Sequence, residues 1–138
     1  MKQFPFIKQQ QAIVLLRISV ALVFMAHALV RVINGTIPEF SLFLDSKGFM
    51  FSKAIVWLIT VFEIAGSVLL ALGYFIKWLA AGFIFILLAG IVLIHASLGW
   101  FVGEHGTGGS EYSFILVMAL VMVASDRGHE QEKAAPDY

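Results

Sequence analysis

Four long apolar stretches occupy most of this 138-residue chain, at residues 12–33, 54–76, 78–98 and 112–124. A helix that spans a membrane needs about 20 predominantly apolar residues to cross a hydrocarbon core about 30 Å thick. The first three stretches have that length, and the fourth is shorter but has neighbours that leave room to extend it. The pattern predicts an all-α membrane protein, an antiparallel four-transmembrane-helix bundle.

The amino-acid composition points to the same class. Hydrophobic residues make up 60% of the chain and charged residues 13%, whereas a soluble domain averages about 25% charged residues. The formal net charge is zero, so nothing indicates nucleic-acid binding. The chain contains no cysteine, so any redox chemistry would depend on a bound cofactor or a partner.

The connecting segments differ in character. After the first stretch, Pro38 opens an amphipathic segment that includes the mostly apolar residues 40–44, and we expect this short segment to lie at the membrane interface. Residues 73–77 predict a tight hairpin between the second and third stretches. We expect residues 1–128 to form a single four-helix transmembrane domain and the polar residues 129–138 to form a disordered tail.

Small residues indicate where neighbouring helices approach each other. Gly66 and Ser67 follow Glu63 on one helix face, and Gly82 and Gly90 lie in the third stretch. Small side chains at contacts between membrane helices let the backbones come close. We therefore expect these positions at helix–helix contacts.

Basic residues near the ends of the stretches predict the orientation, because cytoplasmic loops carry an excess of Lys and Arg. The side that holds both termini and the 76–78 turn carries Lys2, Lys8, Lys77, Arg127 and Lys133. The opposite side carries Lys47 and Lys53. We expect a multi-pass protein of the cytoplasmic membrane with both termini in the cytoplasm.

Several ionisable residues lie in or beside the apolar stretches, where a charge in lipid is costly and usually marks a function. They are His27, Arg31, Glu63, His95 and Glu111. With the expected topology and a rise of about 1.5 Å per residue, all of them fall in or near the outer half of the membrane. The sequence predicts that they gather around one polar cavity open to the outer face, as candidates for ligand binding. It assigns no catalytic residue and no metal site.

The same residues also suit structural roles that involve no ligand. His27 and Arg31 are four residues apart and share a helix face, and Glu63 is the acid available within a span to neutralise Arg31, so we predict an interhelical ion pair. The histidines would also serve as hydrogen-bonding groups between helices. Glu111 at the start of the fourth stretch suits the positive end of a helix dipole. Arg17 near the inner end is expected to extend to the interface.

The order and spacing of several short motifs resemble those of the DoxX family of small four-helix bacterial membrane proteins, from about residue 15 to residue 128. The motifs are Leu16-Arg17-Ile18, His27-Ala28-Leu29-Val30-Arg31, Phe43-Leu44 with Gly48-Phe49, Phe62-Glu63-Ile64-Ala65-Gly66, Leu70-Ala71-Leu72-Gly73, His95 and Gly108-Gly109-Ser110-Glu111. Ala28 stands where the family usually has glycine, and Arg31 where it usually has lysine. Both departures keep similar chemistry.

The resemblance implies a fold and a location in the bacterial inner membrane more directly than it implies a reaction. The family is named after a subunit of an archaeal thiosulfate:quinone oxidoreductase, and other members look like parts of redox or thiol-stress complexes. It implies an accessory or quinone-interacting subunit of a membrane-associated redox system, in contact with the bilayer and with a protein partner or further copies of itself. No self-contained catalytic motif is present, so enzymatic activity stays open.

Other functions compete with this one. A non-enzymatic factor that assembles or anchors a partner protein is the main alternative. A small transporter is less favoured, because the chain shows neither broken helices nor an inverted repeat. A haem held by His27 and His95 is a weaker cofactor hypothesis than a quinone, since it rests on two lone histidines.

Overall fold

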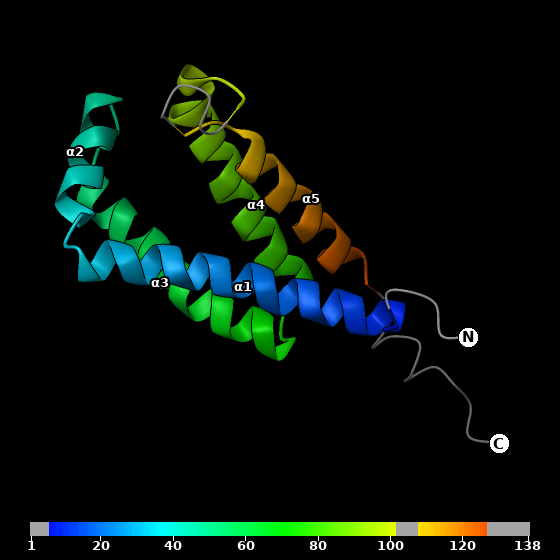
Figure 1. Ribbon diagram of the computed structural model, residues 1–138. Helices are drawn as coiled ribbons and strands as arrows, with labels where there is room; N and C mark the ends of the chain where they lie inside the picture. Colours follow the sequence, from blue (N-terminus) through cyan, green and yellow to red (C-terminus); the bar gives the residue numbers. More distant parts are fainter. Residues whose placement is uncertain (1–5, 102–107, 127–138) are drawn as a thin grey trace.

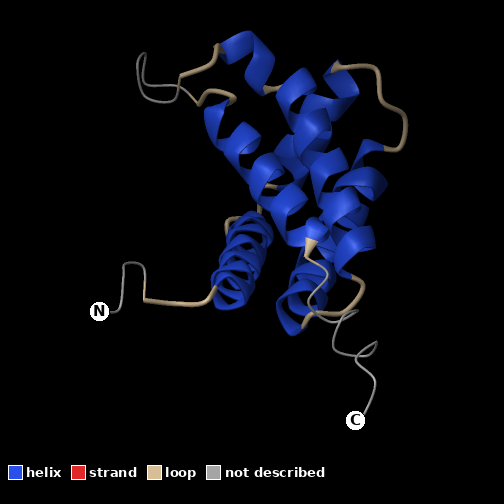
Figure 2. Ribbon diagram, turned by 90° about the vertical axis from the view of Figure 1, so that its right-hand side faces the viewer, coloured by secondary structure: helices blue, strands red, loops and turns tan. Residues whose placement is uncertain are grey.

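The computed structural model describes residues 6–101 and 108–126, and every regular element within those ranges is a helix (Figures 1 and 2). In chain order the elements are α1 (Gln9–Ile33), α2 (Ile37–Ser46), α3 (Ser52–Leu72), α4 (Ile76–Leu93), the 3₁₀ turn η1 (His95–Leu98) and α5 (Glu111–Ser125). The predicted tail at residues 129–138 lies outside the described residues.

Four apolar helices form the bundle. Helix α1 packs on α3, α3 on α4, α4 on α5, and α5 returns to α1. Because the chain reverses direction between successive members of this ring, neighbouring helices are antiparallel. The all-α, antiparallel bundle that the sequence predicted is confirmed. Figure 1 shows α1 with α3 as one pair and α4 with α5 as another, and the two pairs diverge toward the end of the bundle where α2 lies.

Helix lengths and surfaces identify a multi-pass membrane protein. By length and composition, α1, α3 and α4 can each cross a membrane, and α5 is a shorter apolar helix of 15 residues. Large apolar side chains cover the outside of the bundle, among them Leu22 at 63% exposure and Val92 at 74%. In water such a surface would be unfavourable, and in a bilayer it faces lipid.

Two helices end earlier than the apolar stretches do. Helix α3 ends at Leu72, because Gly73 adopts a positive φ of 87°, the left-handed conformation that commonly ends a helix. Helix α4 ends at Leu93, where Ile94 leaves the helical region with φ −120° and ψ −61°. His95 therefore projects from the 3₁₀ turn η1 and not from the membrane helix on which the sequence placed it.

An aromatic stack holds the two helix pairs together at the centre of the bundle. The ring of Phe83 on α4 is fully buried and lies 4.2 Å from the ring centroid of Phe24 on α1 and 5.1 Å from that of Phe62 on α3. Small residues permit this packing, since a Cβ on Gly66 would lie 3.1 Å from the Phe83 ring and a Cβ on Gly82 would collide with Phe62. Both glycines occupy the helix contacts that the sequence predicted for them.

Arg17 differs from its expected position at the interface. It is only 7% exposed, and a Cβ on Gly73 would lie 3.3 Å from both terminal nitrogens of its guanidinium. The side chain is therefore buried against the C-terminal end of α3. The negative end of a helix dipole favours a cation there, which is a physical reason for Arg17 to stay inside the bundle.

Helix α2 is the short segment expected after the first span. It packs on the beginning of α3 through a cluster of Ile37, Leu44 and Val56. Glu39 and Asp45 on its other side are exposed. This amphipathic helix covers one end of the bundle.

Candidate functional site

A cavity of about 630 Å³ lies where the two helix pairs diverge. All five α-helices and η1 contribute to its wall. The wall is mostly apolar: Phe24 of the aromatic stack lines it near the centre of the bundle, and Phe40 and Phe43 line it from α2. The volume falls within the range of about 300–1,000 Å³ that is typical of small-molecule sites.

The structure brings four of the five sequence-predicted site residues to this cavity. They are His27, Arg31, Glu63 and His95. Glu111 does not line it, although the next two residues on α5, Tyr112 and Ser113, do. Glu111 is the first residue of α5, where a carboxylate suits the helix dipole.

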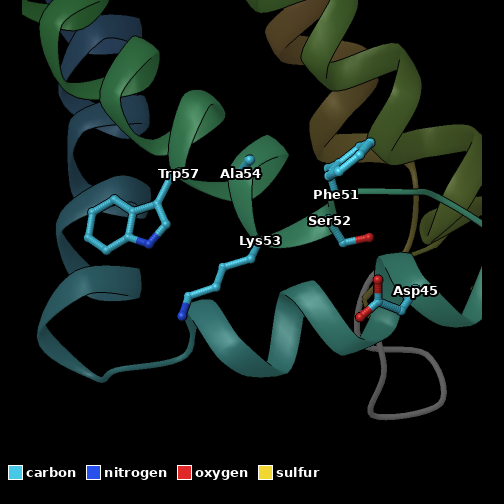
Figure 3. A pocket seen from close by; sticks show the side chains of 6 residues that line it. All are labelled: Asp45, Phe51, Ser52, Lys53, Ala54 and Trp57. Carbon is cyan, nitrogen blue, oxygen red and sulfur yellow. The ribbon is translucent and has the colours of Figure 1, made fainter.

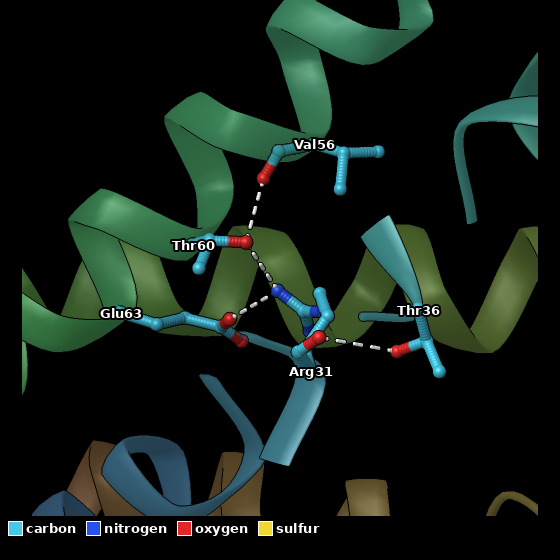
Figure 4. A network of polar contacts seen from close by, with 5 residues as sticks. All are labelled: Arg31, Thr36, Val56, Thr60 and Glu63. Atoms are coloured by element: carbon cyan, nitrogen blue, oxygen red, sulfur yellow. Dashed lines mark hydrogen bonds and ion pairs between the residues drawn. The ribbon is translucent and has the colours of Figure 1, made fainter. Parts of the chain in front are cut away.

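Arg31 and Glu63 form an ion pair between α1 and α3 (Figure 4). Arg31 Nη1 lies 2.7 Å from Glu63 Oε2 and donates a second hydrogen bond, of 3.0 Å, to Thr60 Oγ1. Thr60 in turn donates to the carbonyl oxygen of Val56 at 2.8 Å. The side chain of Glu63 is 5% exposed and that of Arg31 is 16% exposed. The charges thus neutralise each other away from water, while part of the guanidinium still reaches the cavity.

The ion pair is also linked to α2. The guanidinium carbon of Arg31 lies 5.3 Å from the ring centroid of Phe40, within the range of a cation–π interaction. Thr36, just before α2, donates a hydrogen bond of 3.4 Å to the carbonyl oxygen of Arg31. Arg31 therefore binds α3 through its ion pair with Glu63 and contacts α2 through the aromatic ring of Phe40.

Two histidines add polar groups to the wall. His27 lies one helical turn before Arg31 on α1 and is close enough to Glu63 to interact with it electrostatically. His95 Nδ1 is buried and has no hydrogen-bond partner within the part of the chain that the structure describes. A buried polar atom without a partner costs about 1–3 kcal/mol. Such an atom on a cavity wall is available to a ligand.

The α4 side of the cavity is a single helix face. Ile86, Ala89, Gly90 and Leu93 all line the cavity, and their spacing of three and four residues places them on one face. A Cβ added at Gly90 would meet no atom within 4 Å. The sequence suggested a helix contact for Gly90, but the structure places this glycine on the wall of the cavity. The small residues at 89 and 90 widen the cavity at this face.

Sequence reasoning missed the aromatic part of the site. Phe40 and Tyr112 line the cavity, yet their positions in the sequence are equally typical of interfacial aromatic residues. For Ala89 and Gly90 a signal existed, since two small residues lie within an otherwise bulky helical stripe. A small-residue stripe alone does not distinguish a helix contact from a cavity wall.

A second, shallower pocket lies between the end of α2 and the start of α3. It has a volume of about 540 Å³, and its lining residues are Asp45, Phe51, Ser52, Lys53, Ala54 and Trp57. In Figure 3 the side chains of Lys53, Trp57 and Phe51 point in different directions and do not converge on a common point. Among the described residues, no group of three or more His, Asp or Glu side chains could hold a metal ion. The larger cavity is therefore the candidate site.

Comparison with known proteins adds one match. The model of the DoxX family matches residues 12–96 of this chain. The matched segment contains His27, Arg31, Glu63 and His95, and it ends before Glu111. No curated protein and no solved structure gives a significant match.

Proposed function

The chain belongs to the DoxX family, and from this we propose that it is an accessory, quinone-interacting subunit of a membrane-associated redox system. The observation that carries the proposal is the cavity, in which two polar groups interrupt an apolar wall: the partly accessible Arg31 and the Nδ1 of His95, which has no hydrogen-bond partner among the described residues. A quinone has a flat polar head and an apolar tail. Its requirements match a site with apolar walls and few polar groups.

The free donors of Arg31 suit a carbonyl oxygen. Within the described part of the chain, only Nη1 of its guanidinium has hydrogen-bond partners. A guanidinium carries five N–H donors, so Nε and Nη2 can donate to a ligand without breaking the ion pair. A charged donor strengthens such a bond, and the position of Arg31 would then orient the head of the quinone.

The histidines suit the proton chemistry of a quinone, which takes up two protons with two electrons. Neutral imidazole carries one donor and one acceptor nitrogen, so it can accept a proton on one side and donate one on the other. His27 lines the cavity and lies near Glu63, so we infer that it passes protons to a ligand bound there. A partner protein would supply the electrons.

The orientation of the protein in the membrane is part of the same proposal. The excess of Lys and Arg beside the termini and the 73–77 turn supports cytoplasmic termini in a bacterial inner membrane. The cavity would then lie in the outer half of the membrane.

Photoaffinity labelling with an azidoquinone tests the proposal. Protein in lipid nanodiscs is irradiated with the probe, with and without an excess of unlabelled short-chain quinone, and the modified peptides are mapped by mass spectrometry. We expect competed labelling on α3, α4 or η1 residues that line the cavity. Labelling that is not competed, or that falls only on outward-facing residues such as Val92, would contradict quinone binding and leave the assembly factor as the better explanation.

A further inference from the structure

The cavity has an apolar edge between α3 and α4. Leu58 on α3 and Phe85 on α4 both line it, yet Leu58 is 71% exposed and Phe85 is 73% exposed. A residue that lines a cavity and is also highly exposed lies where the cavity meets the surroundings of the protein. These two side chains therefore flank an opening on the α3–α4 side.

Packed side chains border this opening toward the centre of the bundle and toward α2. Toward the centre of the bundle, Phe62 on α3 covers Gly82 and contacts the Phe83 ring. Toward the α2 end, Leu93 of α4 packs against the cluster that contains Val56 of α3. Between Val56 and Phe62 the helix rises about 9 Å. The opening is thus a window in the side of the bundle.

The window lies at the depth of the hydrocarbon core. Leu58 comes six residues after the start of α3 at Ser52, about 9 Å along the helix axis. Phe85 comes eight residues before the end of α4 at Leu93, about 12 Å along its axis. Both helices are long and apolar enough to cross a membrane. With α3 and α4 spanning the bilayer, the window would border lipid and not water.

The charges on the cavity wall restrict what can bind. Arg31 and Glu63 are the only Lys, Arg, Asp or Glu residues among the described lining residues, and they neutralise each other. The ion pair leaves no uncompensated carboxylate or guanidinium on the wall, so a charged ligand would enter a medium of low polarity without its own counter-ion, where an unpaired charge is strongly unfavourable. An uncharged ligand with hydrogen-bonding groups meets no such penalty.

We propose that the cavity admits an uncharged, bilayer-resident amphiphile sideways through the window between Leu58 and Phe85. Its polar head lies beside Arg31, and its apolar tail leaves the cavity between α3 and α4. This inference rests on the proposed function insofar as the cavity is a ligand site. It adds the route of access and extends the ligand class to any neutral lipid-soluble molecule of this shape.

The opposite side of the cavity is less suited to an apolar tail. There the exposed lining residues on the two helices include the polar His27 and the apolar Val23 on α1 and Tyr112 on α5, which is 62% exposed. Polar groups at an edge disfavour contact with a hydrocarbon chain. At the apolar α3–α4 window, a lipid tail would cover no polar side chain.

Spin-label accessibility tests the window without any ligand. The chain has no native cysteine, so single cysteines are introduced at Ala89 and, separately, at Ile59, both on the cavity wall. Val92→Cys on the lipid-facing side of α4 and Ser46→Cys at the exposed end of α2 serve as lipid and water references. Each labelled protein in lipid vesicles is measured by power saturation with oxygen, which concentrates in lipid, and with a nickel chelate, which stays in water.

We expect the cavity labels to be accessible to oxygen like the Val92 label and to be shielded from the nickel chelate. Accessibility to nickel at the level of the Ser46 label would mean that the cavity opens to water, and shielding from both reagents would mean that it is closed; either result would overturn the proposal. The use of two wall positions guards against one variant that fails to fold. No quinone is present in this measurement. Its result can therefore contradict the lateral window while azidoquinone labelling supports quinone binding, or support the window while labelling contradicts quinone binding.

Discussion

Arg31 on α1 and Glu63 on α3 lie 2.7 Å apart although 32 positions separate them in the sequence. The pair joins the two helices on one side of the cavity and neutralises two charges that would be unfavourable singly in a membrane. The same arginine contacts Phe40 of α2. One side chain thus connects three helices around the candidate site.

The ion pair predicts a pronounced non-additivity of mutations. Glu63→Gln and Arg31→Gln each leave one buried charge unpaired, and breaking a buried pair in this way costs about 3–5 kcal/mol. The double variant removes both charges and should be more stable than either single variant. Thermal unfolding of the four proteins in the same detergent measures this.

An exposed acid provides the matched control for that cycle. Glu39→Gln on the exposed face of α2 should change the Tm little, whether it is introduced into the wild type or into the Arg31→Gln variant. Additive losses in the Arg31–Glu63 cycle would show that the two side chains do not stabilise each other.

The aromatic stack predicts a large difference between two phenylalanines on one helix. Phe83 is fully buried against Phe24 and Phe62, whereas Phe85 is 73% exposed. Phe83→Ala removes a core ring and should destabilise the protein by about 3–5 kcal/mol. Phe85→Ala should have a much smaller effect on unfolding in detergent. Equal losses for the two variants would mean that Phe83 does not hold the helix pairs together.

The predicted orientation is tested with single cysteines. Ser46 at the end of α2 and Ser125 at the end of α5 are both exposed and lie at opposite ends of the bundle. With the termini in the cytoplasm, a membrane-impermeant thiol reagent should label Ser46→Cys in intact cells and Ser125→Cys only after the membrane is opened. The reverse pattern would place the cavity in the inner half of the membrane.

Much of the fold follows from local sequence patterns. Apolar stretches of spanning length, together with Pro38 and Gly73 at the ends of elements, predict the helices and their order, because these signals are local. The meeting of Arg31 and Glu63 was also predictable, because a buried charge in a membrane requires a partner and Glu63 is the acid available in a span. The end of α4 before His95 was not predictable, because no glycine or proline marks the departure of Ile94 from helical geometry.

The shape of the site depends on packing that the sequence does not reveal. Whether Gly90 lies against a helix or beside a cavity depends on how far the helix pairs diverge. That divergence follows from the position of the Phe83 stack and from the packing of α2 on α3. The burial of Arg17 against the end of α3 similarly depends on the exact crossing of two helices. Tertiary contacts of this kind have no local signature.

The affinity of a Gly90→Phe variant for a short-chain quinone tests the central claim most directly. A Cβ at position 90 meets no atom within 4 Å, and the position lies in the centre of the α4 cavity face, so a phenyl ring there should occupy the space for a ligand without disturbing the fold. We expect quinone binding in nanodiscs to weaken about tenfold or more, which corresponds to about 1.4 kcal/mol, with an unchanged Tm. Val92→Phe, two residues away on the lipid-facing side, should bind like the wild type. Equal quinone affinity in the Gly90→Phe variant and the wild type would contradict the cavity as the quinone site.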